Sequence, residues 1–130
     1  MKSLNIISLN KSFAKLKFIN NRKPTSTEED LKEAFCALSP YRDGAIYIGH
    51  YAGSSEWERH PKGEEIVYVV EGETTLVMFG EKEDSSIRLK QGELFVVPQN
   101  VWHRFETPVG VKILSVTPEP GDHRIDRPCD

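Results

Sequence analysis

Short apolar segments separated by turn-forming residues are the feature of this chain that most limits its fold. Such segments follow one another closely at residues 45–51, 65–71, 74–79, 87–90, 94–97, 101–106 and 111–117. Gly, Pro, Ser, Asn and Asp gather in the breaks between them. Many short strands with turn signals at close intervals predict a β-sandwich or barrel rather than a parallel α/β sheet. We therefore predict an all-β fold.

The segment before this β region has a different pattern. Residues 4–9 and 13–19 alternate apolar and polar residues and predict two modest N-terminal strands, followed by a loop at 20–26. A short helix is predicted over residues 27–37, before Pro40. Its signals are a Ser or Thr cap, carboxylates in the first turn and apolar residues at helical spacing (Ser26, Thr27, Glu28, Glu29, Leu31, Ala34, Phe35 and Leu38).

The length of 130 residues indicates one domain, because two cores of half this size would not offset their chain entropy. We expect residues 1–44 to pack their strands and helix on a barrel formed by residues 45–118. The last segment, residues 119–130, contains prolines and is expected to be an extended tail at the surface.

Charge and composition exclude several function classes. With 17 Lys and Arg against 20 Asp and Glu, the formal net charge is −3, which argues against a nucleic-acid partner. No apolar run approaches the roughly 18 residues of a membrane span, so no membrane partner is expected. The two cysteines cannot form a disulfide framework, and with no targeting signal they favour a reduced, cytoplasmic protein.

Two histidines and a glutamate stand where these predicted strands could bring them together. A tight turn at residues 61–63 is expected to join a hairpin that places His60 near Glu65. His103 comes from a strand roughly 40 residues later, and packing of that strand beside the hairpin would complete two imidazoles and a carboxylate. This set suits a divalent transition metal with open positions: iron(II), manganese, nickel, cobalt or zinc.

The spacing within two segments resembles the two motifs of the cupin superfamily. The second motif is carried by Gly92, Pro98, Asn100, His103 and Thr107, and the first by Glu65 and Gly72. Cupins usually have Gly where Asn100 stands, and often Asn where Thr107 stands. Asn tolerates the left-handed backbone that Gly would supply, so the departure at Asn100 is mild. Two departures remain in the first motif: the spacing from Gly53 is one residue short, and Glu58 stands where the motif has its first His.

The resemblance implies a double-stranded β-helix, or small jelly roll, with a pocket in the barrel mouth. It also implies that His60, Glu65 and His103 are metal ligands, with Glu58 in the remaining ligand position. Glu58 would either bind as a second carboxylate or stay unbound and act as a catalytic base.

The face of the strand that neighbouring residues share indicates which of them point toward the site. Phe105 lies on the face of His103 and is expected to line the substrate pocket, whereas Trp102 should point away from the metal. Tyr47 and Tyr51 share a face and either fill the core or offer hydroxyls to a ligand. His50 and His123 are not expected to be ligands, and Cys36 and Cys129 are expected to be inert; all four lie outside the motifs.

These observations predict a small cupin that binds a divalent metal and a small polar organic molecule. With iron(II) the reaction would be an oxygenation, and with another metal an isomerisation or elimination. The alternative is a non-enzymatic module that binds a metabolite or sugar without a catalytic metal. We also predict a homodimer, because an open jelly roll leaves sheet edges that need covering and the N-terminal strands could cross to a partner.

Overall fold

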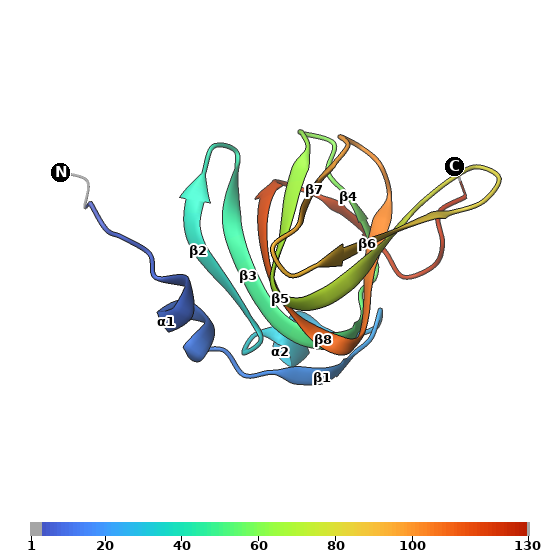
Figure 1. Ribbon diagram of the computed structural model, residues 1–130. Helices are drawn as coiled ribbons and strands as arrows, with labels where there is room; N and C mark the ends of the chain where they lie inside the picture. Colours follow the sequence, from blue (N-terminus) through green and yellow to red (C-terminus); the bar gives the residue numbers. More distant parts are fainter. Residues whose placement is uncertain (1–3, 130) are drawn as a thin grey trace.

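A computed structural model describes residues 4–129 and shows a predominantly β structure in which strands curl around a central core (Figure 1). Two short helices are α1 (Leu9–Ala14) and α2 (Glu28–Leu31). The strands are β1 (Ile19–Arg22), β2 (Phe35–Tyr41), β3 (Gly44–Ser54), β4 (Trp57–Arg59), β5 (Glu65–Met78), β6 (Ser85–Lys90), β7 (Leu94–Val97), β8 (His103–Pro118) and β9 (Asp122–Arg124). The all-β, jelly-roll-like class predicted from the turn pattern is confirmed.

The long strand β8 organises the sheet. Along its length it pairs antiparallel with β3 on one side and with β5 on the other, and its first residue pairs with β4. β5 continues the sheet to β6 and β7, while β3 carries β1 and β2 at the opposite edge. Since both motif segments meet on β8 and its neighbours, residues far apart in the chain come together in one end of the barrel.

The core lies inside this curled sheet. Its buried members are Tyr51, Val67, Val69, Leu76, Met78, Leu89, Val97, Phe105, Val111 and Ile113. A second, smaller cluster contains Trp57, Val77 and Trp102. Alternate residues of β5 and β8 supply the core, as the period of two in a strand requires.

The predicted N-terminal strands at residues 4–9 and 13–19 are wrong. Residues 4–8 have no regular structure, and Ser8 caps α1 by accepting a hydrogen bond from the Lys11 amide at 3.2 Å. Phe13 is buried from this helix rather than from a strand. Within residues 4–34, the only strand is β1, which starts at Ile19 and extends into the segment predicted as a loop.

The predicted helix at residues 27–37 is correct only in its first turn. Thr27 and Asp30 form a capping box, and the helix then ends at Leu31. From Phe35 onward the chain is the edge strand β2, which tolerates Pro40 because an edge strand leaves some amides unpaired. The ring of Phe35 packs over Gly49 of β3, so tertiary packing overrides the helical spacing.

Two predicted breaks in the β region are bulges rather than turns. Predicted strands 65–71 and 74–79 are one strand, β5, whose register shifts around Gly72. Segments 101–106 and 111–117 are likewise one strand, β8. The tail predicted as extended contains β9, which pairs with β4. Within residues 4–129, no helix is long and apolar enough to cross a bilayer.

Candidate metal centre

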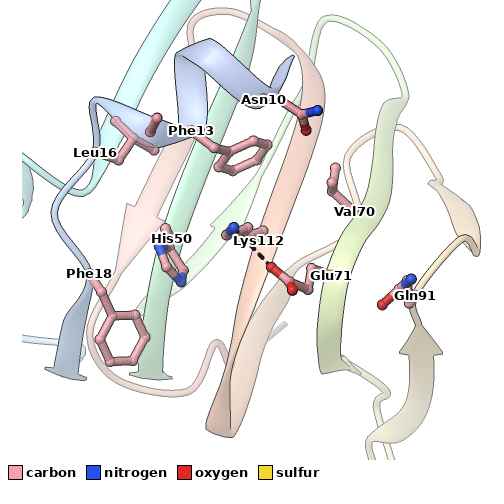
Figure 2. Close-up of a pocket in the computed structure, with 10 residues that line it drawn as sticks. Asn10, Phe13, Leu16, Phe18, His50, Val70, Glu71, Gln91 and Lys112 are labelled. Atoms are coloured by element: carbon pink, nitrogen blue, oxygen red, sulfur yellow. Dashed lines mark ion pairs between the residues drawn. The ribbon is translucent and has the colours of Figure 1, made fainter.

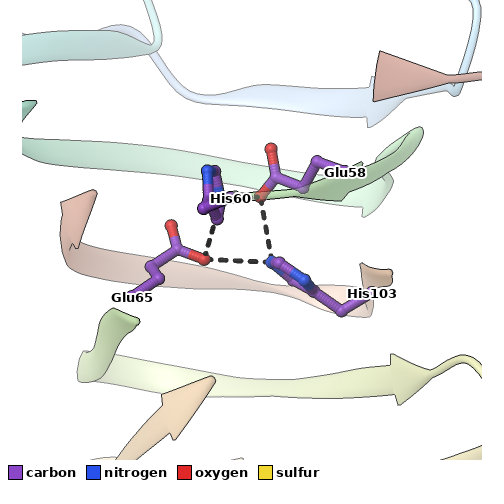
Figure 3. Close-up of side chains that lie close together, drawn as sticks. All are labelled: Glu58, His60, Glu65 and His103. Carbon is purple, nitrogen blue, oxygen red and sulfur yellow. Dashed lines mark hydrogen bonds and ion pairs between the residues drawn. The ribbon is translucent and has the colours of Figure 1, made fainter. Parts of the chain in front are cut away.

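The structure brings the four predicted ligands together at one end of the barrel (Figure 3). Glu58 lies in β4, and His60 follows directly after it. Glu65 is the first residue of β5, and His103 is the first residue of β8. The predicted hairpin between the His60 and Glu65 segments is wrong, because β4 pairs with β8 and β9 rather than with β5. Instead, Glu58 of β4 pairs with His103 of β8.

The ligand atoms form a compact group. One atom from each of the four residues lies within 4.8 Å of every other. His103 Nε2 is 3.0 Å from Glu65 Oε1 and 3.4 Å from Glu58 Oε1. His60 Nε2 is 3.4 Å from Glu65 Oε1 and 3.9 Å from Glu58 Oε1. The four His–Glu distances of 3.0–3.9 Å fall in the range of roughly 3 to 4.4 Å expected for ligands bound at about 2.0–2.2 Å to one ion.

Neighbouring groups orient two of the ligands. His103 Nδ1 donates to the Val101 carbonyl at 2.9 Å, which leaves Nε2 directed at the cluster. The Thr117 hydroxyl donates to Glu65 Oε2 at 2.8 Å, and Thr117 Oγ1 lies 3.0 Å from Ser115 Oγ. Partners of this kind fix ligand geometry in metal sites.

Charge coupling within the cluster shifts three pKa values strongly. Burial lowers the pKa of His103, but hydrogen bonds and charges from Glu58 and Glu65 outweigh it and raise that pKa to about 10. The nearby carboxylates of Glu58 and Glu65 also outweigh burial at His60 and raise its pKa to about 9. Burial raises the pKa of Glu58, yet the two histidines hold it well below its usual range. Without a metal, the carboxylates thus stabilise the protonated imidazoles.

His60 provides the observation that fits a metal best. Its side chain is buried, and neither Nδ1 nor Nε2 has a hydrogen-bond partner among the described residues. Buried ring nitrogens left unpaired are unfavourable, and a metal ion on Nε2 would satisfy one of them. Two imidazoles with two carboxylates form a donor set for a divalent transition metal.

A cavity of about 140 Å³ adjoins the cluster. Glu58 and Glu65 line it together with the three predicted pocket residues, Tyr47, Tyr51 and Phe105. Tyr47 donates its hydroxyl to Glu119 at 2.6 Å, and burial together with this bond raises the pKa of Tyr47 to about 12. Their roles toward a ligand stay predictions.

The same cavity has lining residues that the sequence did not indicate. Arg22, Phe35, Ser115 and Thr117 all face it. The sequence predicts a loop at Arg22 and a helix at Phe35, and neither prediction places these side chains at a pocket. Ser115 and Thr117 could have been found from the period of two in a strand, which places them on the same face as Ile113.

The remaining candidate residues lie elsewhere. His50 contacts Phe18 at a centroid distance of 4.8 Å and borders a separate groove under α1, with Phe13, Glu71 and Lys112 (Figure 2). His123 is half exposed and pairs with Glu56 at 3.0 Å. Both cysteines are exposed free thiols.

Comparison with known proteins agrees with this geometry. Residues 48–117 match the sequence profile of the cupin domain. This chain belongs to the cupin family. A relative of this cupin is the uncharacterized protein YdbB of Bacillus subtilis (strain 168), which is 26% identical over 113 residues and aligned over 85% of this chain and 97% of its own.

Two solved structures are similar to this cupin in fold. A cupin-2 domain protein of Shewanella frigidimarina superposes with a TM-score of 0.66 at 22% identity, covering 88% of this chain and 95% of that one. A hydroquinone 1,2-dioxygenase, PnpCD, solved with Cd²⁺ and 4-hydroxybenzonitrile, gives 0.56 at 18% identity, covering 65% and 63%. This cupin therefore has a His/Glu group that could hold a metal ion, in a fold shared with a dioxygenase.

Proposed function

We propose that this cupin binds a divalent transition metal through His60, Glu65, His103 and Glu58, and a small polar organic molecule in the adjoining cavity. The observation that carries the proposal is the convergence of four ligand atoms within 4.8 Å, with neither ring nitrogen of buried His60 hydrogen-bonded. A bound metal would supply a Lewis acid with open positions for substrate oxygens.

The chain's own residues would then bind and orient the substrate. Phe105 and Tyr51 form apolar walls that exclude water, and the Tyr47 hydroxyl offers a polar contact. Thr117 keeps Glu65 in place through its hydrogen bond. Glu58 is the most exposed member of the cluster, at 20%, so it is the one best placed to meet a substrate and act as a base where it does not bind the metal.

We further propose that the reaction is an oxygenation. Support comes from the fold shared with hydroquinone 1,2-dioxygenase and from a ligand set that suits iron(II). Oxygen uptake by the iron(II)-loaded protein with candidate phenolic substrates checks this step. Binding of a metabolite with no metal requirement would instead support the non-enzymatic module.

Metal analysis of the purified protein tests the site itself. We expect close to one metal ion per chain by mass spectrometry, without added metal or chelator. His60→Ala and His103→Ala should each lose most of it, because each removes one of the ligands. His50→Ala is the matched control, since His50 lies outside the cluster, and it should keep the wild-type content. Metal content unchanged by His60→Ala and His103→Ala would refute the site.

A further inference from the structure

Arg22 reaches the candidate site from outside the two cupin motifs. It is the last residue of β1, which pairs parallel with β3, and it lines the cavity that Glu58 and Glu65 also line. A small molecule in this cavity would therefore touch the guanidinium at one side and the candidate metal ligands at the other.

Aromatic stacking holds the guanidinium in place. Arg22 Cζ lies 4.9 Å from the centre of the Phe35 ring and 4.6 Å from that of Tyr51. The two rings stack on one another at 5.4 Å. A guanidinium placed over aromatic rings is preorganised, and its N–H groups remain free to donate in its plane.

Unlike four of the other arginines, Arg22 has no acidic partner among residues 4–129. Arg59, Arg88, Arg104 and Arg127 each pair with a carboxylate within 4.0 Å. Among residues 4–129, no carboxylate lies within that distance of Arg22. A half-buried guanidinium without an acidic partner favours an anion.

The charge of the loaded site points the same way. Two carboxylates would balance a divalent ion and the imidazoles would be neutral, which leaves the positive charge of Arg22 uncompensated. The cavity of about 140 Å³ is small beside the roughly 300–1,000 Å³ of drug-sized pockets, so the anion is a small one.

We infer that Arg22 binds a carboxylate group of the ligand, so that this cupin takes a small organic acid. The planar fork of a guanidinium matches a carboxylate in a bidentate pair. This inference deepens the proposed function and rests on it for the metal-bound end of the ligand.

Acetate is the probe for the test, because it carries the carboxylate and little else. In metal-free protein at constant ionic strength, sodium acetate should shift the Nε–H signal of Arg22 in NMR spectra to saturation. Arg22→Met should weaken acetate binding, followed at the backbone amides of residue 22 and Gly53, by roughly ten- to a hundredfold. Arg22→Lys keeps the charge without the fork and should lie between the two.

Three controls separate the possible outcomes. Arg88→Met removes an exposed arginine paired with Glu73 and should leave acetate binding unchanged. Inorganic phosphate should bind more weakly than acetate; tighter binding would overturn the choice of a carboxylate. Arg22→Met should also keep the wild-type content of metal, because Arg22 is not among the candidate ligands.

The inference would be overturned if acetate caused no saturable shift of the Arg22 Nε–H signal. It would also be overturned if Arg22→Met lost its metal content as well as its acetate binding. The latter result would make Arg22 a structural residue. If the wild-type protein binds no metal but acetate still shifts Arg22, the proposed metal function fails and the anion site stands. The two proposals therefore fail in distinguishable ways.

Discussion

Glu65 is held at the candidate metal centre by hydroxyl groups of β8. Thr117 donates to its Oε2, and Ser115 lies within hydrogen-bond distance of Thr117. The other carboxylate oxygen, Oε1, faces the two histidines. One oxygen is thus fixed by the sheet while the other is presented to the cluster.

Thr117→Val removes this hydrogen bond with little change in shape. We expect the affinity for a divalent metal such as Co²⁺ to fall roughly ten- to a hundredfold, because Glu65 loses the group that orients it. Calorimetric titration of metal-free protein measures the change. Thr25→Val, at an exposed position, is the control. Equal affinities for Thr117→Val and wild-type protein would show that the bond plays no part in metal binding.

Single residues also explain where this chain departs from the cupin motif. Asn100 has a φ of +64°, so it adopts the left-handed backbone expected of the usual glycine. Thr107 is buried, donates to the Glu73 carbonyl at 2.8 Å and accepts from the Gly110 amide at 3.1 Å. Both substitutions thus preserve the local backbone.

At the scale of the element, β1 depends on a glycine in the strand beside it. Gly53 pairs with Arg22 and has a φ of +117°. A Cβ at this position would lie 2.2 Å from the Arg22 carbonyl oxygen, which is closer than atoms can approach. Gly53 therefore allows β1 to place Arg22 beside the cavity.

Gly53→Ala should destabilise the protein by roughly 3 kcal/mol, from the strained backbone and the clash together. Gly92→Ala is the matched control, because Gly92 also has a positive φ but has nothing within 4 Å of the added methyl. It should cost about 1–2 kcal/mol. Urea unfolding followed by circular dichroism measures both. A Gly53 variant as stable as the Gly92 variant would contradict the steric argument.

At the scale of the whole molecule, a bound metal joins the strands that supply its ligands. β4, β5 and β8 each hold part of the cluster, so a ligand that binds only the folded state stabilises all of them together. A metal at a hundred times its dissociation constant adds about 2.7 kcal/mol, or on the order of 10 °C in Tm. Differential scanning calorimetry with and without Co²⁺ checks this, and His103→Ala should show no increase. An equal increase in that variant would place the metal elsewhere.

The homodimer stays a prediction, and it now depends on exposed apolar residues, because residues 4–18 contain no strand that could cross to a partner. Leu4 and Ile6 are almost fully exposed on a segment that extends away from the barrel (Figure 1). Ile66 and Leu94 are also exposed, on the outward face shared by β5 and β7. Apolar groups of this kind mark interaction surfaces. We expect a dimer by light scattering at micromolar concentration, and the double variant Leu4→Ser, Ile6→Ser should shift it toward monomer. A monomeric wild-type protein would refute the prediction.

The β class and the four candidate ligands follow from the amino-acid sequence alone. Turn residues at close intervals are local signals, and a period of two reports which face of a strand is buried. Glu65 is accordingly buried and Glu64 exposed, as their adjacent positions on a strand require. Motif spacing then selected His60 and His103 over His50 and His123, although their binding of a metal stays a prediction.

The contribution of the N-terminal segment to the site depends on contacts between segments that lie far apart in the chain. The spacing of Leu31, Ala34 and Phe35 suits a helix, but pairing with β3 and packing on Gly49 make Phe35 part of a strand. No local sequence pattern indicates where Arg22 lies, because its position depends on a parallel pairing with a strand some 30 residues away. Contacts between distant segments carry no periodicity in the sequence, and this is why the anion-binding end of the cavity could not be predicted from it.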